Sequence, residues 1–272
     1  MEFLQKNKIE KQRKNTLFLT KKISIIFSSE ILFKALLKFS LIKKHANDKL
    51  SLHQNFRKEY FNQDLIIFIE TEKISHFITS WVYSSSTYVH SSDYFLTNFD
   101  LLKHCKEINQ IPTIKIIEDL QSKNFIHENT TYYKKLNDRI KNNKPVTKQQ
   151  ILLNSEEKVK NHFKRIHSLH QSIAKNGLIS NIEFSKYGKQ HIDREIGIAI
   201  NNDGTIIKLQ GGQHRFAIAK LQKIEKIPVE IRLIHKDIIE NISNKYRISS
   251  IEAIYLIKDT LASKSSIDSL LI

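Results

Sequence analysis

The chain of 272 residues contains one cysteine, Cys105, so it can form neither an intrachain disulfide nor a zinc site built from cysteines. This scarcity agrees with a reducing, cytoplasmic location. The sequence also lacks a charge-free hydrophobic run long enough to span a membrane. The nearest candidate, residues 23–42, contains Glu30, Lys34 and Lys38. Because these three fall four residues apart, they predict one polar stripe on an amphipathic helix. The N-terminal residues are charged throughout, so we expect no signal peptide.

Acidic residues are few compared with basic ones. The chain has 28 Asp and Glu against 44 Lys and Arg, which gives a formal net charge of +16. Such an excess favours polyanionic partners, namely nucleic acid, nucleotides or acidic lipid surfaces. The lysines are spread along the whole chain, so a diffuse lysine coat without a specific partner also accounts for the charge. Hydrophobic residues make up 40% of the chain, which is enough for a buried core.

The spacing of apolar residues predicts three elements of secondary structure between residues 64 and 141. Residues 64–69 form a short apolar run that predicts a buried strand. Residues 99–107 have a helical pattern. Residues 130–141 predict a helix with its apolar side chains on one face, and Thr130 or Thr131 is the expected cap.

Glycine is absent from the first 176 residues. All six glycines lie between Gly177 and Gly212. Glycine is needed where φ is positive or where the backbone approaches another group closely. We therefore expect this window to hold the specialised backbone of the protein.

The same region has a regular order of elements. Its apolar spacing and turn residues predict, in chain order, a helix at 163–175 that ends at Gly177, strands at 181–184, 195–200 and 205–209, a helix at 214–222 and a strand at 227–231. The turn at 201–204, Asn-Asn-Asp-Gly, joins its two flanking strands into a β-hairpin.

A strand, the pair Gly211-Gly212 and a helix follow one another, and this order suits an anion. The first N–H groups of a helix have no partners within it, and the helix dipole adds positive charge there. Arg215 carries a fork of donors suited to phosphate oxygens, His214 can donate a hydrogen bond, and Gln213 can present an amide. The pattern also fits a tight strand-to-helix turn with a surface His-Arg pair.

The run LQGGQHRFAIAKL at 209–221, followed by Ile227-Pro228-Val229, resembles the signature of the ParB/sulfiredoxin-like superfamily. In that family a Gly-x-His-Arg or Gly-x-Arg-Arg turn precedes an alanine-rich helix and an Ile-Pro-Val strand. Upstream, Gly177-Leu178 at the end of a predicted helix is similar to the other box of the family. The resemblance covers residues 164–236 and implies a core whose turn holds the phosphates of a nucleotide.

The resemblance separates the branches of the family. Sulfiredoxins have a cysteine nucleophile where this chain has Gln213, so reduction by their route is not expected. ParB proteins bind CTP and carry a helix-turn-helix, for which the residues after Pro228 leave little room. In the free-serine kinase branch the turn holds ATP phosphates and a carboxylate acts as base.

An uncharacterised group that accompanies surface-polysaccharide genes is the most similar. Its Glu-Ile hairpin, its Asp-Gly turn and its later His have counterparts here in Glu195, Asp203 and His235. The sequence departs from that group at Asn202, where the group has Arg. Glu195 is the expected general base or magnesium ligand, and the alternative is a strand-end carboxylate paired with Arg194.

We thus expect an α+β fold, with a helical and mixed region at 1–145, a ParB/sulfiredoxin-like core at 150–240 and C-terminal helices at 241–272. The resemblance implies binding of ATP or CTP with magnesium, and phosphotransfer to a small hydroxylated or cell-envelope precursor. It assigns catalysis to Glu195 and His214, and nucleotide binding to Gly177, Leu178, Gly211, Gly212, Gln213, His214 and Arg215. We expect no metal-ligand cluster. The alternative is a ParB-like DNA-binding or regulatory protein without catalysis.

Overall fold

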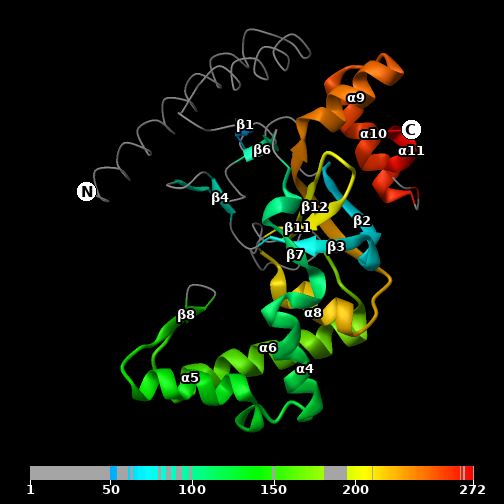
Figure 1. The fold of residues 1–272 in the computed structure, drawn as a ribbon. Coiled ribbons are helices and arrows are strands. Elements are labelled where there is room, and N and C mark those ends of the chain that lie inside the picture. Colours follow the sequence, from blue (N-terminus) through cyan, green and yellow to red (C-terminus); the bar gives the residue numbers. More distant parts are fainter. Residues whose placement is uncertain are drawn as a thin grey trace.

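A mixed β-sheet lies at the centre of the structure, with helices below it and at its upper right in Figure 1. The computed structural model describes residues 50–53, 61, 64–78, 81–83, 87–89, 94–97, 100–148, 151–180, 195–209, 211–263, 265 and 267–271. The helix expected at 23–42 and the strand expected at 181–184 lie outside them. The helices and the mixed sheet confirm the α+β class.

The order of strands across the sheet is β1 (Leu50–His53), β6 (Tyr94–Thr97), β12 (Lys226–His235), β10 (Ile196–Ile200), β11 (Ile206–Lys208), β3 (Ile74–Phe77) and β7 (Lys106–Glu107). β2 (Ile66–Glu70) also pairs with β12, antiparallel. β10 and β11 form the predicted antiparallel hairpin, whereas β10 and β12 run parallel. Two small ribbons, β4 (Trp81–Tyr83) with β5 (Thr87–Val89) and β8 (Val146–Lys148) with β9 (Ile151–Leu153), lie apart from this sheet.

The sequence Ile-Gly-Ile-Ala-Ile explains why β10 is a central strand. All five of its residues are buried, as expected for a strand covered on both faces. Ile196, Ile198 and Ile200 share one face and belong to the main core, as the alternation predicts. Ala199 faces the other way, into a smaller apolar cluster with Leu209.

Strands from residues 50–107 and from 196–235 therefore belong to one sheet. The domain boundaries that we expect near residues 145 and 240 stay predictions. The helix expected at 99–107 is wrong, because the chain there forms a single 3-10 turn at Leu102–His104 and then strand β7. The cause is tertiary: Leu101 N donates to Asn201 Oδ1 at 2.9 Å, and β7 pairs with β3.

The helices form two groups. α8 (Gln213–Leu221) packs against α4 (Pro112–Ser122) and α6 (Glu156–Asn176), and α6 packs against α5 (Thr131–Lys141). α9 (Lys236–Tyr246) packs against β12 and α10 (Ser250–Ala262), α10 against β2, and α11 (Asp268–Leu271) against α9. Figure 1 shows the first group below the sheet and the second above it. Among the described residues, no helix has the length and apolar character that a bilayer span requires.

Side-chain caps fix several helix ends. Thr130 caps α5 by accepting from the N–H of Tyr133, which confirms one of the two expected caps. Ser155 caps α6, so this helix begins at Glu156 and not near Phe163 as predicted. Its C-terminal end is at Gly177, as expected.

Candidate functional site

The turn between β11 and α8 is built on two glycines in the left-handed region. Gly211 has a φ of 103°, and Gly212, the N-terminal cap of α8, has a φ of 58°. A Cβ on Gly212 would lie 2.8 Å from Cγ1 and 3.1 Å from Cα of Ile196. The helix start therefore lies directly against the first residue of β10, and glycine is required there for both reasons.

A buried lysine lies beneath this turn. Lys208, only 2% exposed, donates from Nζ to the carbonyl oxygens of Gly211 at 2.8 Å and Leu209 at 2.9 Å. Burial, and then the charge of Arg232, lowers the pKa of Lys208 to about 7. Because a trans peptide directs its C=O and N–H in opposite directions, the N–H of Gly212 points away from this ammonium group.

Two residues predicted to face a ligand pair with each other, and their predicted roles toward a ligand stay predictions. Arg215 Nη1 lies 2.8 Å from Glu195 Oε1; the Glu195 side chain is buried and that of Arg215 is 14% exposed. Arg215 Nη2 also donates to the carbonyl of Ile179 at 2.6 Å. The guanidinium thus ties α8 to the start of β10 and to the segment that follows α6.

Arg232 on β12 adds a second guanidinium next to the turn. Its side chain lies over Gly197 of β10, where a Cβ would be 2.8 Å from Arg232 Cδ. Nη2 donates to the carbonyl of Glu195 at 3.0 Å, and Nε donates to Glu230 Oε2 at 2.5 Å. The two carboxylates recorded at the turn are therefore each matched by an arginine.

Two histidines from different helices meet at the start of α8. The rings of His162 on α6 and His214 on α8 are 5.9 Å apart and nearly perpendicular. Burial lowers the pKa of each ring to about 4. Neighbouring cations contribute to this lowering of the pKa: Lys148 acts on both rings, Arg165 on His162 and Lys208 on His214. Buried His162 Nε2 has no hydrogen-bond partner within the described part of the chain.

Gln213, the first residue of α8, is held from the side. Its Oε1 accepts a hydrogen bond from Thr113 Oγ1 of α4 at 3.2 Å. Pro112 occupies the first position of α4, where its fixed φ suits a helix start. The starts of α4 and α8 are therefore linked next to the turn.

The remaining predicted nucleotide-binding residues have structural roles. Gly177 ends α6 with a φ of 69°, and Leu178 is buried in the main core. The next residue, Ile179, is linked to the turn, because its carbonyl accepts a hydrogen bond from Arg215. Their assignment to nucleotide binding stays a prediction.

The side chains of Asp203 and His235 accept hydrogen bonds from backbone N–H groups. Asp203 Oδ1 accepts from the N–H of Thr205 at 3.0 Å and from Asn201 Nδ2 at 3.1 Å, so this carboxylate stabilises the hairpin turn. His235 is buried at the end of β12, where its Nδ1 accepts from the N–H of Asp237 and caps α9.

Sequence reasoning missed four residues of this site, namely Lys148, His162, Lys208 and Arg232. One signal was present, since a glycine inside a strand, such as Gly197, often marks a close approach of another group. The others come from elements that only the fold brings together.

The described residues contain no group of three or more His, Cys, Asp or Glu that could hold a metal ion. The comparisons found no matching family model, no matching curated protein and no matching solved structure.

Proposed function

We propose that the protein binds a nucleoside triphosphate, ATP or CTP, with the phosphates at the start of α8. The supporting observation is an excess of positive charge at this helix start. Glu195 and Glu230 are paired with Arg215 and Arg232, whereas Lys208 is held by carbonyl oxygens. Carbonyl oxygens do not cancel the charge of an ammonium group, so the protonated form of Lys208 adds positive potential from beneath the turn, without contact to an anion bound by the N–H of Gly212. With a pKa of about 7, Lys208 is about half protonated at neutral pH.

The two histidines support the same ligand. A phosphate at the α8 start would replace the cationic surroundings of His162 and His214 with negative charge, and so raise the pKa of both rings. Each ring would then take up a proton and donate to the phosphate. The helix start and the N–H of Gly212 supply neutral donors to the same anion.

Magnesium fits as a partner of the triphosphate and not as a resident ion. Mg²⁺ commonly keeps several waters and uses one or two carboxylates together with substrate phosphates. Glu195 is one of the two carboxylates next to the turn, and it could complete such a set. No described cluster of acidic residues would hold the ion alone.

Binding is the function that this geometry supports best, and transfer is a further step. Glu195 would have to leave Arg215 to accept the proton of a small hydroxylated acceptor. The acceptor oxygen would then form its bond to the terminal phosphorus as the bond to the nucleoside diphosphate breaks. The recorded contacts leave Glu195 bound to Arg215.

Titration calorimetry with ATP, CTP, GTP and ADP, each with and without magnesium, tests the proposal. We expect saturable binding of one triphosphate. Lys148→Ala, at an exposed residue, should weaken it by roughly fivefold, the size of an exposed charge interaction. Lys123→Ala, which removes an exposed charge just after the C-terminal end of α4, is the matched control.

Proton uptake gives a second readout. At pH 6 the binding enthalpy should depend on the ionisation enthalpy of the buffer, because the histidines gain protons, and His162→Asn should reduce that dependence. Absence of binding for all four nucleotides would overturn the proposal. Equal effects of the Lys148 and Lys123 variants would place the ligand elsewhere.

A further inference from the structure

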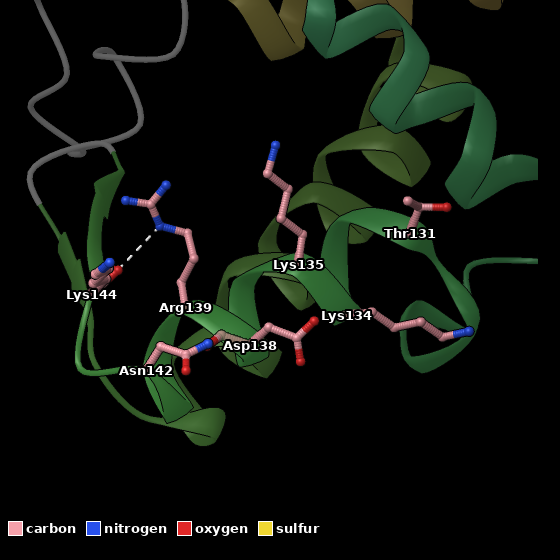
Figure 2. Close-up of a pocket in the computed structure, with 7 residues that line it drawn as sticks. All are labelled: Thr131, Lys134, Lys135, Asp138, Arg139, Asn142 and Lys144. Carbon is pink, nitrogen blue, oxygen red and sulfur yellow. Dashed lines mark hydrogen bonds between the residues drawn. The ribbon is translucent and has the colours of Figure 1, made fainter.

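A second feature of the surface is a hollow of about 600 Å³ on α5 and the turn that follows it. Figure 2 shows the seven residues that line it. Four of them are cations, Lys134, Lys135, Arg139 and Lys144, and one is an acid, Asp138. We call this feature the α5 hollow. It is separate from the β11–α8 turn and does not depend on nucleotide binding there.

Positive charge is dense at this place. Of the eighteen residues from Thr131 to Lys148, six are Lys or Arg and one is Asp. By contrast, α4 and α10 each carry one lysine and two acidic residues. The α5 segment is therefore a local source of positive potential.

Two of the cations of the α5 hollow are placed to act together. Lys135 and Arg139 are one helical turn apart, and Figure 2 shows their side chains extending to the same side of α5. Arg139 Nε donates to the carbonyl of Lys144 at 3.1 Å. This hydrogen bond orients the guanidinium, and its dashed line in Figure 2 leads from Nε, so that the two terminal nitrogens are not part of it.

The chemistry of the lining selects the class of partner. None of the seven residues is apolar or aromatic. The apolar side of α5, with Tyr133 and Leu136, is buried in the main core. A membrane surface is a poor match, since interfacial helices insert apolar side chains. Without aromatic side chains there is also no platform for stacking bases.

We propose that the α5 hollow binds the phosphate backbone of nucleic acid, independently of base sequence. Lysine and arginine contacts to phosphates position nucleic acid without reading its bases. Asn142 also lines the hollow. Its Nδ2 donates one hydrogen to the carbonyl of Asp138, and an amide nitrogen carries a second hydrogen that can be donated to a phosphate oxygen. The partner of the α5 hollow is therefore a single-stranded or duplex nucleic acid, whose phosphates repeat along the chain.

The C-terminal helices do not offer an alternative nucleic-acid surface. α9 and α10 are joined by a three-residue turn, 247–249, which has the length found in helix-turn-helix domains. The exposed charged residues of α10 are Glu252 and Asp259, whereas Lys258 is half-buried. An acidic outer face repels phosphates, so α10 is not expected to enter a groove.

The test is fluorescence anisotropy with mixed-sequence duplex DNA and single-stranded RNA from 50 to 200 mM salt. The slope of log K against log salt is negative. The variant Lys134→Gln/Lys135→Gln/Arg139→Gln should reduce its magnitude by about two to three, since each lost phosphate contact removes roughly 0.7–0.9. At about 100 mM salt the corresponding loss in affinity is at least a hundredfold. The matched control, Lys123→Gln/Lys175→Gln/Lys226→Gln, removes three exposed lysines from other surfaces.

Several outcomes would overturn the proposal. These are no binding of either nucleic acid at 50 mM salt, an equal loss in the two triple variants, and binding of anionic lipid vesicles in preference to nucleic acid. The nucleotide titration is a separate readout, because the α5 variant retains the α8 turn. A loss of nucleic-acid binding with ATP or CTP binding intact would separate the two sites.

Discussion

Arg215 and Glu195 form a buried ion pair across the start of β10, with Nη1 and Oε1 2.8 Å apart. The same guanidinium donates to the carbonyl of Ile179. A buried ion pair is sensitive to the loss of one partner, because the remaining charge stays desolvated. The pair therefore stabilises the relative positions of α8, β10 and the segment after α6.

Replacing one member of this pair is expected to be costly. Arg215→Ala should lower the free energy of unfolding by about 3–5 kcal/mol, since Glu195 would stay buried without its partner. The double variant Arg215→Met/Glu195→Met should recover most of that loss, because apolar residues of similar volume replace both charges. Urea denaturation of the single and double variants measures the difference. A loss under 1 kcal/mol in Arg215→Ala would show that the pair is not structural.

Alanine substitutions at two glycines distinguish the cost of backbone strain from the cost of steric overlap. Gly212 and Gly177 have similar positive φ values, but a Cβ on Gly177 meets no atom within 4 Å, whereas one on Gly212 meets Ile196. Gly177, with ψ of −173°, lies in a backbone region that is essentially restricted to glycine, so Gly177→Ala should lose about 1–3 kcal/mol from strain alone. Gly212, with ψ of 21°, is left-handed helical, so Gly212→Ala should lose about 1–2 kcal/mol from strain and about 1–3 kcal/mol more from overpacking. A loss of only about 1 kcal/mol for Gly212→Ala in denaturant unfolding would contradict the close contact between α8 and β10.

The buried lysine predicts a rise of stability with pH. The pKa of Lys208 is about 7 in the folded protein, against 10.5 for an ordinary lysine. Between these values the unfolded chain binds more protons, so stability increases as pH rises above 7. From pH 7 to pH 9 the gain is about 2 kcal/mol. Lys208→Met should abolish it.

Thermal or urea unfolding at pH 7, 8 and 9 is the measurement for Lys208. The range ends at pH 9 because Cys105 acts in the opposite direction above it. Burial raises the pKa of that thiol to about 12, which disfavours the folded state at higher pH. If the free energy of unfolding rises with pH by the same amount in Lys208→Met, another group is responsible for the pH dependence.

Local patterns predicted the elements near the turn well. The alternation of Ile196, Ile198 and Ile200 identified the buried face of β10, and Gly211-Gly212 located the start of α8. These features depend on periodicity and on glycine, which neighbouring residues alone determine. The cap at Ser155 was equally local. Its two following glutamates favour a helix start, so this boundary was available from the sequence.

The partners within the site could not be predicted in the same way. Lys208 looks solvent-exposed in a strand pattern, and its burial arises because β3, from a distant part of the chain, pairs with β11. The meeting of His162 with His214 depends on how α6 packs against α8. Arg215 matched a phosphate-binding pattern, yet its recorded contacts are with Glu195 and Ile179.

The pairing of β2 with β12 has a consequence for synthesis of the chain. Val229 pairs with Ile67 across about 160 residues of sequence. At roughly 5–20 residues per second, β2 leaves the ribosome about 10–30 s before its partner. During that interval its apolar residues, including Ile67 and Ile69, lack the strand that covers them. Until β12 emerges, β2 therefore presents an unpaired edge and apolar side chains to other molecules.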